Sequence, residues 1–329
     1  MKAAALTADR PNLEVVQLDD PRPAAGEALI RVVGCGVCGS DLHVASSMGA
    51  PGTVLGHEIA GVVEELGAGV QAINVGAAVA VRPFVGCGQC AFCAAGRQDH
   101  CKSFEFIGVQ RPGGFAEYTT ASAAELFELP ASVRAEDHAL VEPFAVARRA
   151  LRRAALVPGE SMIVLGGGPI GLAITHWARA LGAGRITVSD PLAQRRDLAV
   201  ALGADAAVTP DEIRDAAGDG APLVVECSGK PRVLDQAMQL AAIDGRVAVV
   251  GICLANDTIF PWWGLQKELD VRFSLYYGRE DFTDTIDAFA SGALAPDGLV
   301  TETVGLDALP ERFARLAAQG DAGKIVVTP

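Results

Sequence analysis

The stretch IVLGGGPIGLAI, residues 163–174, joins an apolar run to a helix-forming run through a glycine-rich turn. Gly166, Gly168 and Gly171 give this turn the spacing GxGxxG. Glycines in that arrangement let the backbone approach a pyrophosphate, which then lies at the N-terminus of a helix. The spacing alone is a weak signal because glycine-rich turns are common. Together with the strand before it and the helix after it, it predicts a dinucleotide site.

An acidic residue follows the glycines at the distance expected of such a site. The next predicted strand, RITVSD, ends in Asp190, nineteen residues after Gly171. A carboxylate there binds ribose hydroxyls and repels a 2′-phosphate, which favours NAD over NADP. Arg195 and Arg196 oppose this preference, because a nearby arginine can accommodate the phosphate. A strand–turn–helix without a ligand is the alternative.

The pattern around this turn predicts an α/β fold. From about residue 143, strand candidates alternate with helical stretches, which predicts βαβ units and a doubly wound parallel sheet of the Rossmann type. Residues 1–140 hold short apolar runs broken by glycine and proline, which are typical of strands with tight turns. After DVRFSLYYG we expect shorter elements, and the chain ends in KIVVTP. The expected plan is a β-rich domain around an inserted or following α/β domain.

The composition excludes some functions. The chain has 329 residues, enough for two domains, and its net charge of −13 argues against a general binder of nucleic acid or anionic membranes. No apolar run is long enough to span a membrane, and MKAAALTADRP shows no secretion signal, so we expect a soluble cytoplasmic protein. Six of the eight cysteines lie between positions 35 and 101, which favours metal binding over disulfides.

Four of these cysteines form one motif, CGQCAFCAAGRQDHC, with the spacing C-x2-C-x2-C-x7-C. They are Cys87, Cys90, Cys93 and Cys101. Four thiolates in a short loop match a closed tetrahedral zinc site, which is structural because it has no open position. An iron–sulfur cluster and a redox pair are the alternatives. A ferredoxin-type run tends to have tighter spacing before its last cysteine and a proline after it, whereas Lys102 follows here.

A second group of donors lies in GVCGSDLH (36–43) and VLGHEIAG (54–61). Cys38, His57 and Glu58 offer one soft and two harder ligands, and three protein ligands plus water are typical of a catalytic zinc. A hydrogen-bonded core histidine is the alternative for His57. Cys35 stands in an apolar run and is interpreted as a buried small hydrophobe, not as half of a redox CxxC.

With these residues the chain resembles the zinc-dependent medium-chain dehydrogenase/reductase family, in its alcohol and polyol dehydrogenase branch. The resemblance covers essentially the whole chain and rests on MKAAAL, GVCGSDLH, GHEIAG, the four-cysteine lobe, GGFAEY, EPFAVA, GGGPIG and GKIVV. It implies a GroES-like catalytic domain at 1–145 with a zinc lobe at about 84–103. It also implies an NAD-binding Rossmann domain at 146–275 and a return to the catalytic domain at 276–329.

The resemblance also implies residue roles. It places the catalytic zinc on Cys38, His57, Glu58 and Glu142. Glu142 opens EPFAVA and matches a position that binds zinc directly or holds its water. Ser40 matches the hydroxyl that takes the substrate proton, and His43 matches the histidine that passes it to solvent. Asp41 matches a carboxylate that orients the zinc-bound histidine.

The cofactor is expected to be NAD, with NADP less favoured, beside two zinc ions per chain. The residues expected to bind it are Gly166, Gly168, Pro169, Ile170, Gly171, Asp190, Arg195, Val250 and Lys324. Lys324 matches a basic residue that the family often has near the pyrophosphate. The resemblance further implies a homo-oligomer, with a tetramer favoured over a dimer, and a small alcohol or ketone as the partner molecule.

The expected reaction is the reversible oxidation of a secondary alcohol, either a diol, a polyol or a cyclic or branched alcohol, to a ketone. Oxidation of hydrophobic or primary alcohols, or of aldehydes, with NADP as a possible cofactor, is the alternative. The segment between His43 and His57 is shorter than in the family, and Arg148 and Arg149 stand where relatives commonly have a histidine. Both departures bear on which substrate the chain accepts. Four aromatic residues are candidates for an apolar pocket or for core packing: Trp262, Trp263, Phe104 and Phe106.

Two rival classes remain. A zinc-free reductase of quinones or enones has the same fold but lacks both the four-cysteine lobe and the Cys/His/Glu set. A zinc module that binds nucleic acid or protein would need a basic stripe, whereas the lobe carries only Arg97 and Lys102 in an acidic chain.

Overall fold

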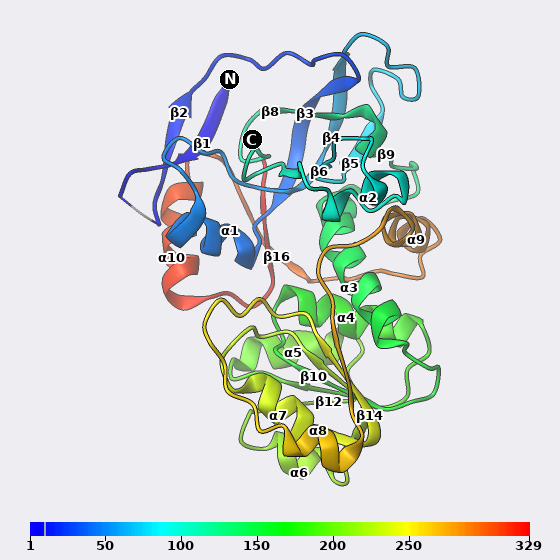
Figure 1. Cartoon of the computed structure of the whole chain (residues 1–329). Coiled ribbons are helices and arrows are strands. Elements are labelled where there is room, and N and C mark those ends of the chain that lie inside the picture. Colours follow the sequence, from blue (N-terminus) through cyan, green and yellow to red (C-terminus); the bar gives the residue numbers. More distant parts are fainter. Residues whose placement is uncertain (10) are drawn as a thin grey trace. The chain divides into compact units, whose positions relative to one another are not determined.

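The computed structural model describes residues 1–9 and 11–329, which form two compact units. The first unit holds residues 1–142, 278–291 and 300–329. The second holds residues 143–277 and 292–299. Element labels follow Figure 1.

The second unit is built on a parallel sheet of six strands in the order β12-β11-β10-β13-β14-β15. Its strands are β10 (Met162–Leu165), β11 (Ile186–Ser189), β12 (Ala206–Val208), β13 (Ala221–Glu226), β14 (Ala241–Val249) and β15 (Asp270–Phe273). The strand order reverses beside β10, as it does in doubly wound sheets that bind dinucleotides. The predicted Rossmann sheet is confirmed.

Helices cover both faces of this sheet because side chains of a strand alternate between faces. Ile163 and Leu165 share a buried cluster with Ile213 of α6 (Ile213–Ala217) and with α7 (Val233–Leu240). Val164 faces the other way, toward α4 (Pro169–Ala180). The unit also contains α5 (Ala193–Ala201), α8 (Trp262–Lys267) and, from Pro143 onward, α3 (Val141–Ala154).

The first unit is built on a mixed sheet of seven strands. Its order is β16-β17-β3-β4-β5-β9, with β8 paired to β3 as well. The strands are β3 (Glu27–Gly36), β4 (Glu58–Leu66), β5 (Ala78–Val81), β8 (Tyr118–Ser122), β9 (Leu126–Glu128), β16 (Val300–Val304) and β17 (Lys324–Val327). The register pairs Gly36 with Glu58 and with Val326, so three distant segments meet at one end of β3.

Short elements complete this unit. Two small ribbons are formed by β1 (Lys2–Leu6) with β2 (Leu13–Gln17), and by β6 (Phe84–Val85) with β7 (Glu105–Phe106). The second ribbon closes the four-cysteine lobe, which contains α2 (Ala91–Ala94) and η2 (Gln98–His100). Helix α1 (Gly39–His43) continues into η1 (Val44–Met48), and η3 (Ala123–Glu125) and η4 (Ala135–Leu140) are single turns or short 3-10 segments.

The expectation of shorter elements after DVRFSLYYG is wrong for two of them. Helices α9 (Arg279–Ala290) and α10 (Leu309–Gln319) have 12 and 11 residues. In α9, Phe282, Ile286 and Phe289 are buried on one face at the spacing i, i+4, i+7. That periodicity is present in the sequence and is typical of an amphipathic helix.

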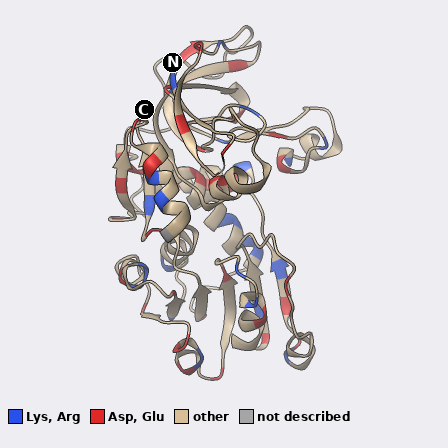
Figure 2. Ribbon diagram, turned by 90° about the vertical axis from the view of Figure 1, so that its left-hand side faces the viewer, with Lys and Arg blue, Asp and Glu red and all other residues tan. Residues whose placement is uncertain are grey.

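Charged residues of both signs are interspersed along the ribbon (Figure 2). Among the described residues, no helix has the length and apolar character needed to cross a membrane.

Candidate metal centres and cofactor turn

The four predicted cysteines come together in the lobe. The sulfur atoms of Cys87, Cys90, Cys93 and Cys101 all lie within 4.8 Å of one another. The sulfurs of Cys87 and Cys93 are 4.0 Å apart. Backbone N–H groups point at the cluster, from Cys87 to the sulfur of Cys101 at 3.3 Å and from Cys93 to that of Cys90 at 3.5 Å.

The thiols of this cluster differ in acidity. The N–H of Cys93 lowers the pKa of Cys90 to about 6. Burial raises the pKa of Cys93 to about 12, and a side-chain hydrogen bond with Cys90 adds to the rise. Four neighbouring thiolates repel one another, so all four become anionic together only around a cation. The donor set therefore fits a thiolate-bound Zn²⁺ without an open position.

A buried arginine that the sequence analysis missed ties the lobe to the sheet. Arg82 is fully buried, and its Nη1 lies 2.7 Å from Oε2 of Glu125. Its Nη2 donates to Oε1 of Gln98, inside the lobe, at 3.3 Å. Arg279 of α9 shares the same oxygen of Glu125 at 3.1 Å. Arg82 thus reaches the lobe by a hydrogen bond to Gln98 and is itself held by a buried ion pair with Glu125, a link that no local motif in the sequence indicates.

The second predicted group also assembles. Ligand atoms of Cys38, His57 and Glu58 lie within 4.8 Å of one another. Cys38 precedes α1, while His57 and Glu58 stand at the start of β4. The pairing of Gly36 with Glu58 between β3 and β4 brings the two segments together. A Cβ on Gly36 would lie 1.8 Å from Oε2 of Glu58, so only glycine leaves room for this carboxylate.

Asp41 joins two parts of this group. Its Oδ2 accepts the N–H of Cys38 at 2.9 Å, which caps α1, and its Oδ1 lies 3.2 Å from Nδ1 of His57. Because an ionised carboxylate only accepts hydrogen bonds, the contact with Asp41 places a proton on Nδ1 and leaves Nε2 as the nitrogen that could bind a metal. Burial disfavours a charged ring, yet Asp41 and Cys38 together raise the pKa of His57 well above its usual value.

Glu58 is fully buried and uses only one oxygen. Its Oε1 lies 2.5 Å from Nζ of Lys324, which also donates to the carbonyl of Val37 at 3.1 Å. Burial opposes the charge of Lys324, but Glu58, Cys38 and Glu142 together raise the lysine's pKa above its usual value. Oε2 of Glu58 has no hydrogen-bond partner among the described residues. An orphaned buried oxygen beside a thiol and an imidazole fits a bound divalent cation.

Three further predicted residues lie near this group. Glu142 is buried, and its charge acts on Lys324, but it is not one of the three residues whose ligand atoms cluster. Oγ of Ser40 lies 3.4 Å from Nε2 of His57. His43 is half-buried at the end of α1. Lys324 has two protein partners within its own unit, so its expected contact with a pyrophosphate remains a prediction that this geometry does not support.

The glycine turn has the geometry that a pyrophosphate site requires. Gly166 has φ +101°, and a Cβ on Gly171 would lie 1.9 Å from the carbonyl oxygen of Gly166. Gly168 is the N-cap of α4, where it offers no capping side chain, and Pro169 and Ile170 open the helix. The backbone N–H groups in the first turn of α4 therefore have no capping side chain and could bind an anion.

Asp190 is part of the same turn. It is buried, and its Oδ2 accepts the N–H of Gly167 at 2.8 Å while its Oδ1 accepts that of Leu192 at 2.9 Å. Nη1 of Arg195 lies 3.4 Å from Oδ2 of Asp190. Arg196 instead donates to the carbonyl of Asp190 at 2.9 Å. Of the two arginines, Arg195 therefore contacts the carboxylate predicted for the ribose.

A second acid, which the sequence predictions do not include, lies at this edge of the sheet. Glu226 ends β13 and is buried, and its Oε1 accepts the N–H groups of Ser228 and Gly229 at 2.7 and 2.9 Å. Its backbone carbonyl accepts the N–H of the predicted cofactor residue Val250 at 2.8 Å. The signal in the sequence is an acid at the end of an apolar strand, in VVECSG.

Aromatic residues and Cys35 can also be placed. Cys35 is fully buried in the core of the first unit, as predicted. Trp262 is 49% exposed, so the core-packing interpretation is wrong for this side chain, whereas Trp263 packs against the core of the second unit. Phe104 and Phe106 form a cluster with Phe84, and the ring centroid of Phe106 lies 5.1 Å from that of His57.

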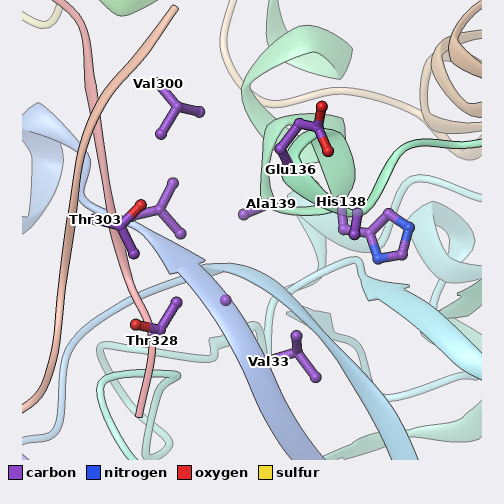
Figure 3. Close-up of a pocket in the computed structure, with 10 residues that line it drawn as sticks. Val33, Glu136, His138, Ala139, Val300, Thr303 and Thr328 are labelled. Atoms are coloured by element: carbon purple, nitrogen blue, oxygen red, sulfur yellow. The ribbon is translucent and has the colours of Figure 1, made fainter.

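A cavity of about 180 Å³ lies in the first unit between η4, β3, β16 and β17. Figure 3 shows Glu136, His138 and Ala139 of η4 with Val300 and Thr303 of β16 around it. Nε2 of His138 lies 3.2 Å from the carbonyl of Val133. None of the predicted site residues lines this cavity.

Comparison with known families and proteins gives consistent results. Residues 24–131 match the alcohol dehydrogenase GroES-like domain, and residues 169–291 match the zinc-binding dehydrogenase family. A 2-dehydro-3-deoxy-L-galactonate 5-dehydrogenase of Pseudoalteromonas atlantica is 34% identical over 93% of this chain and 92% of its own length. An L-threonine 3-dehydrogenase of Pyrococcus horikoshii is 34% identical over 95% of this chain and 94% of its own.

Solved structures agree with the fold. An Escherichia coli alcohol dehydrogenase in complex with NADH superposes with a TM-score of 0.92 at 28% identity, covering 100% of this chain and 99% of the other. A zinc-binding dehydrogenase from Sinorhizobium meliloti, bound to NADP, superposes equally well, with a TM-score of 0.92, 32% identity and the same coverage. The predicted GroES-like domain is thereby confirmed.

Proposed function

The chain belongs to the zinc-containing alcohol and polyol dehydrogenases of the medium-chain dehydrogenase/reductase family, and from that premise we propose that it oxidises a secondary alcohol to a ketone with NAD. It is an NAD(P)-dependent zinc dehydrogenase that acts on CH–OH groups. The proposal adds the substrate class, the preferred dinucleotide and the residue roles.

One observation carries the proposal: Cys38, His57 and Glu58 converge, and Oε2 of Glu58 is buried without a hydrogen-bond partner among the described residues. These three residues would hold a zinc ion, and Glu142 would bind it or its water. The lobe's four thiolates would hold a second, structural ion. When bound, zinc supplies Lewis acidity to the alcohol oxygen, and the nicotinamide supplies the hydride acceptor.

The chain's own residues would handle the proton. Ser40 accepts the proton of the substrate hydroxyl, and His43 passes it to solvent. The 3.4 Å between Ser40 Oγ and Nε2 of His57 supports a place for this hydroxyl beside the metal. Asp41 holds His57 in the tautomer that leaves Nε2 for the metal.

For the dinucleotide, we propose that residues 146–275 bind NAD in preference to NADP. The carboxylate of Asp190 next to the glycine turn supports this, because it would repel a 2′-phosphate. Arg195 beside it is the residue that would weaken the preference. In Asp190→Ser, kcat/KM for NAD divided by kcat/KM for NADP is expected to be lower than in the unmutated enzyme. Equal kcat/KM values in the unmutated enzyme would show that Arg195 outweighs the carboxylate.

The substrate class rests on the donor set and on the relatives. A carboxylate pair at Glu58 and Glu142, with a single thiolate, makes a harder site than two thiolates would, so it suits a substrate with a second oxygen. The two curated relatives named above are dehydrogenases of a sugar acid and of threonine, whose oxidised groups their names place at carbons 5 and 3. We therefore place vicinal diols and polyols ahead of simple hydrophobic alcohols.

The test is a panel of alcohols with NAD and with NADP, followed by the absorbance of the reduced nicotinamide, with and without chelator. Secondary alcohols are expected to give the highest kcat/KM, and chelator to remove the activity. If ethanol or benzyl alcohol exceeds every secondary alcohol, the substrate class is wrong. Activity that survives complete removal of zinc would contradict the metal roles as well.

A further inference from the structure

We propose that Phe106 is a positioning residue for His57, through which the four-cysteine lobe holds the imidazole of the candidate catalytic metal site. This inference rests on the proposed zinc site at Cys38, His57 and Glu58. The residues involved all lie in the first unit.

The first step is the direct contact. The ring centroids of Phe106 and His57 are 5.1 Å apart, and the rings are inclined by 49°. Asp41 contacts Nδ1 of His57, and the proposed zinc would take Nε2, so both restraints act in the plane of the imidazole. Such bonds resist sliding within the plane more than tilting out of it. The contact with the inclined ring of Phe106 supplies a restraint that in-plane bonds lack.

The second step is the rigidity of Phe106 itself. It pairs with Phe84 across the β6–β7 ribbon, and the two ring centroids are 5.6 Å apart. Its carbonyl oxygen accepts the N–H groups of Val109 and Gln110, each at 3.0 Å. Its own N–H donates to Oε1 of Gln110 at 2.9 Å. A backbone held on both sides, with a partly buried ring, makes Phe106 a fixed support.

The third step connects this support to the lobe. The guanidinium of Arg82 lies 4.7 Å from the ring centroid of Phe84, which is fully buried. The same guanidinium donates to Gln98, between Cys93 and Cys101. The two strands of the ribbon, β6 and β7, directly precede and follow the cysteines of the lobe in the chain. A continuous set of contacts therefore runs from the thiolate cluster through Gln98, Arg82, Phe84 and Phe106 to His57.

Outer groups that orient a metal-bound histidine change metal affinity when removed. Phe106→Ala is therefore expected to weaken the metal at the open site while it leaves the four thiolates unchanged. Phe104→Ala is the matched control. The ring centroid of Phe104 lies 5.9 Å from those of both Phe84 and Phe106, so its loss disturbs the same cluster without removing the ring that packs on His57.

The experiment titrates the full-length zinc protein with a chelator and measures zinc per chain by elemental analysis, with thermal unfolding as a check on folding. In Phe106→Ala, the chelator concentration that removes the weaker zinc is expected to fall about 10-fold, and Phe106→Tyr, which keeps the ring, to restore it. Phe104→Ala is expected to behave as the unmutated protein. If Phe106→Ala does not fold, Phe106→Leu, which retains apolar volume without a ring, takes its place.

A double-mutant cycle tests the part played by the lobe. Gln98→Ala is expected to weaken the same zinc in the unmutated background and to add nothing in the Phe106→Ala background. Additive effects, an unchanged zinc affinity in Phe106→Ala, or an equal loss in Phe104→Ala would each overturn the proposal. A parent protein that never holds zinc at the open site would instead overturn the proposed function, so the two failures are distinguishable.

Discussion

The two cysteine-containing groups of the first unit use similar residues in opposite ways. The lobe surrounds its centre with four sulfurs from one short segment, residues 87–101. The open group takes one sulfur, one imidazole and one carboxylate from two segments that only the β3–β4 pairing brings together. The first arrangement leaves no free coordination position and suits a structural ion. The second leaves a position open and suits chemistry on a substrate.

Each group also contains an aspartate that contacts a histidine. Asp41 lies 3.2 Å from Nδ1 of His57, whose other nitrogen faces the open group. Asp99 lies 2.5 Å from Nδ1 of His100 and 3.0 Å from Nη2 of Arg97. His100 is largely exposed and is not one of the lobe's four ligands. An Asp–His pair therefore orients a candidate ligand in the open group, whereas the Asp–His pair of the lobe only stabilises a loop.

The largest expected effect comes from exchanging a cysteine in each group. Cys38→Ser is expected to lower kcat/KM by more than about 100-fold, since the loss of groups one step further from the metal already costs 10- to 100-fold. Cys90→Ser is expected to lower the thermal midpoint by about 10 °C, because it opens a site that contributes to folding. Steady-state kinetics and thermal unfolding of both variants check this. Equal effects on both readouts would abolish the distinction between the groups.

An intermediate effect is expected from the two aspartates. Asp41→Asn is expected to reduce zinc affinity or kcat/KM at least about 10-fold, because an amide can present its N–H₂ to Nδ1 and favour the wrong tautomer. Asp99→Asn is the matched control and is expected to leave kcat/KM within about 2-fold, with a small loss of stability. Chelator titration and kinetics of both variants measure the difference. A large loss of activity in Asp99→Asn would mean that its histidine also serves the reaction.

The smallest change to the protein itself, with no residue replaced, is the removal of metal. The unmutated protein is expected to bind two zinc ions per chain, one at each group. Mild chelation is expected to remove the ion of the open group, with reversible loss of activity, and to leave the ion held by four thiolates. Elemental analysis before and after chelation measures this. Zinc content of one or none in carefully purified protein would contradict the two-site interpretation.

Most of the fold was readable from local pattern. The strand SMIVLGG and the helix after the glycines follow from periodicity and turn residues, and both are present as β10 and α4. Helices α9 and α10 are longer than the elements expected for this part of the chain, and each exceeds ten residues. Cys87, Cys90, Cys93 and Cys101 cluster as expected because ligand type and spacing are local properties of one segment. Cys38 also clusters with His57 and Glu58, but through the β3–β4 pairing, and Glu142 is not among these three. The roles of their members remain predictions.

What the sequence by itself determined was the set of donors, the glycine turn and the alternation of strands and helices. Only the tertiary structure decided which distant residues support them. Lys324 reaches Glu58 across 266 positions, and Phe106 packs against His57 through the β6–β7 ribbon. Motifs are local because a ligand or a turn needs neighbouring residues at fixed spacing. Supporting contacts depend on sheet register and burial, and these arise only when the whole chain packs.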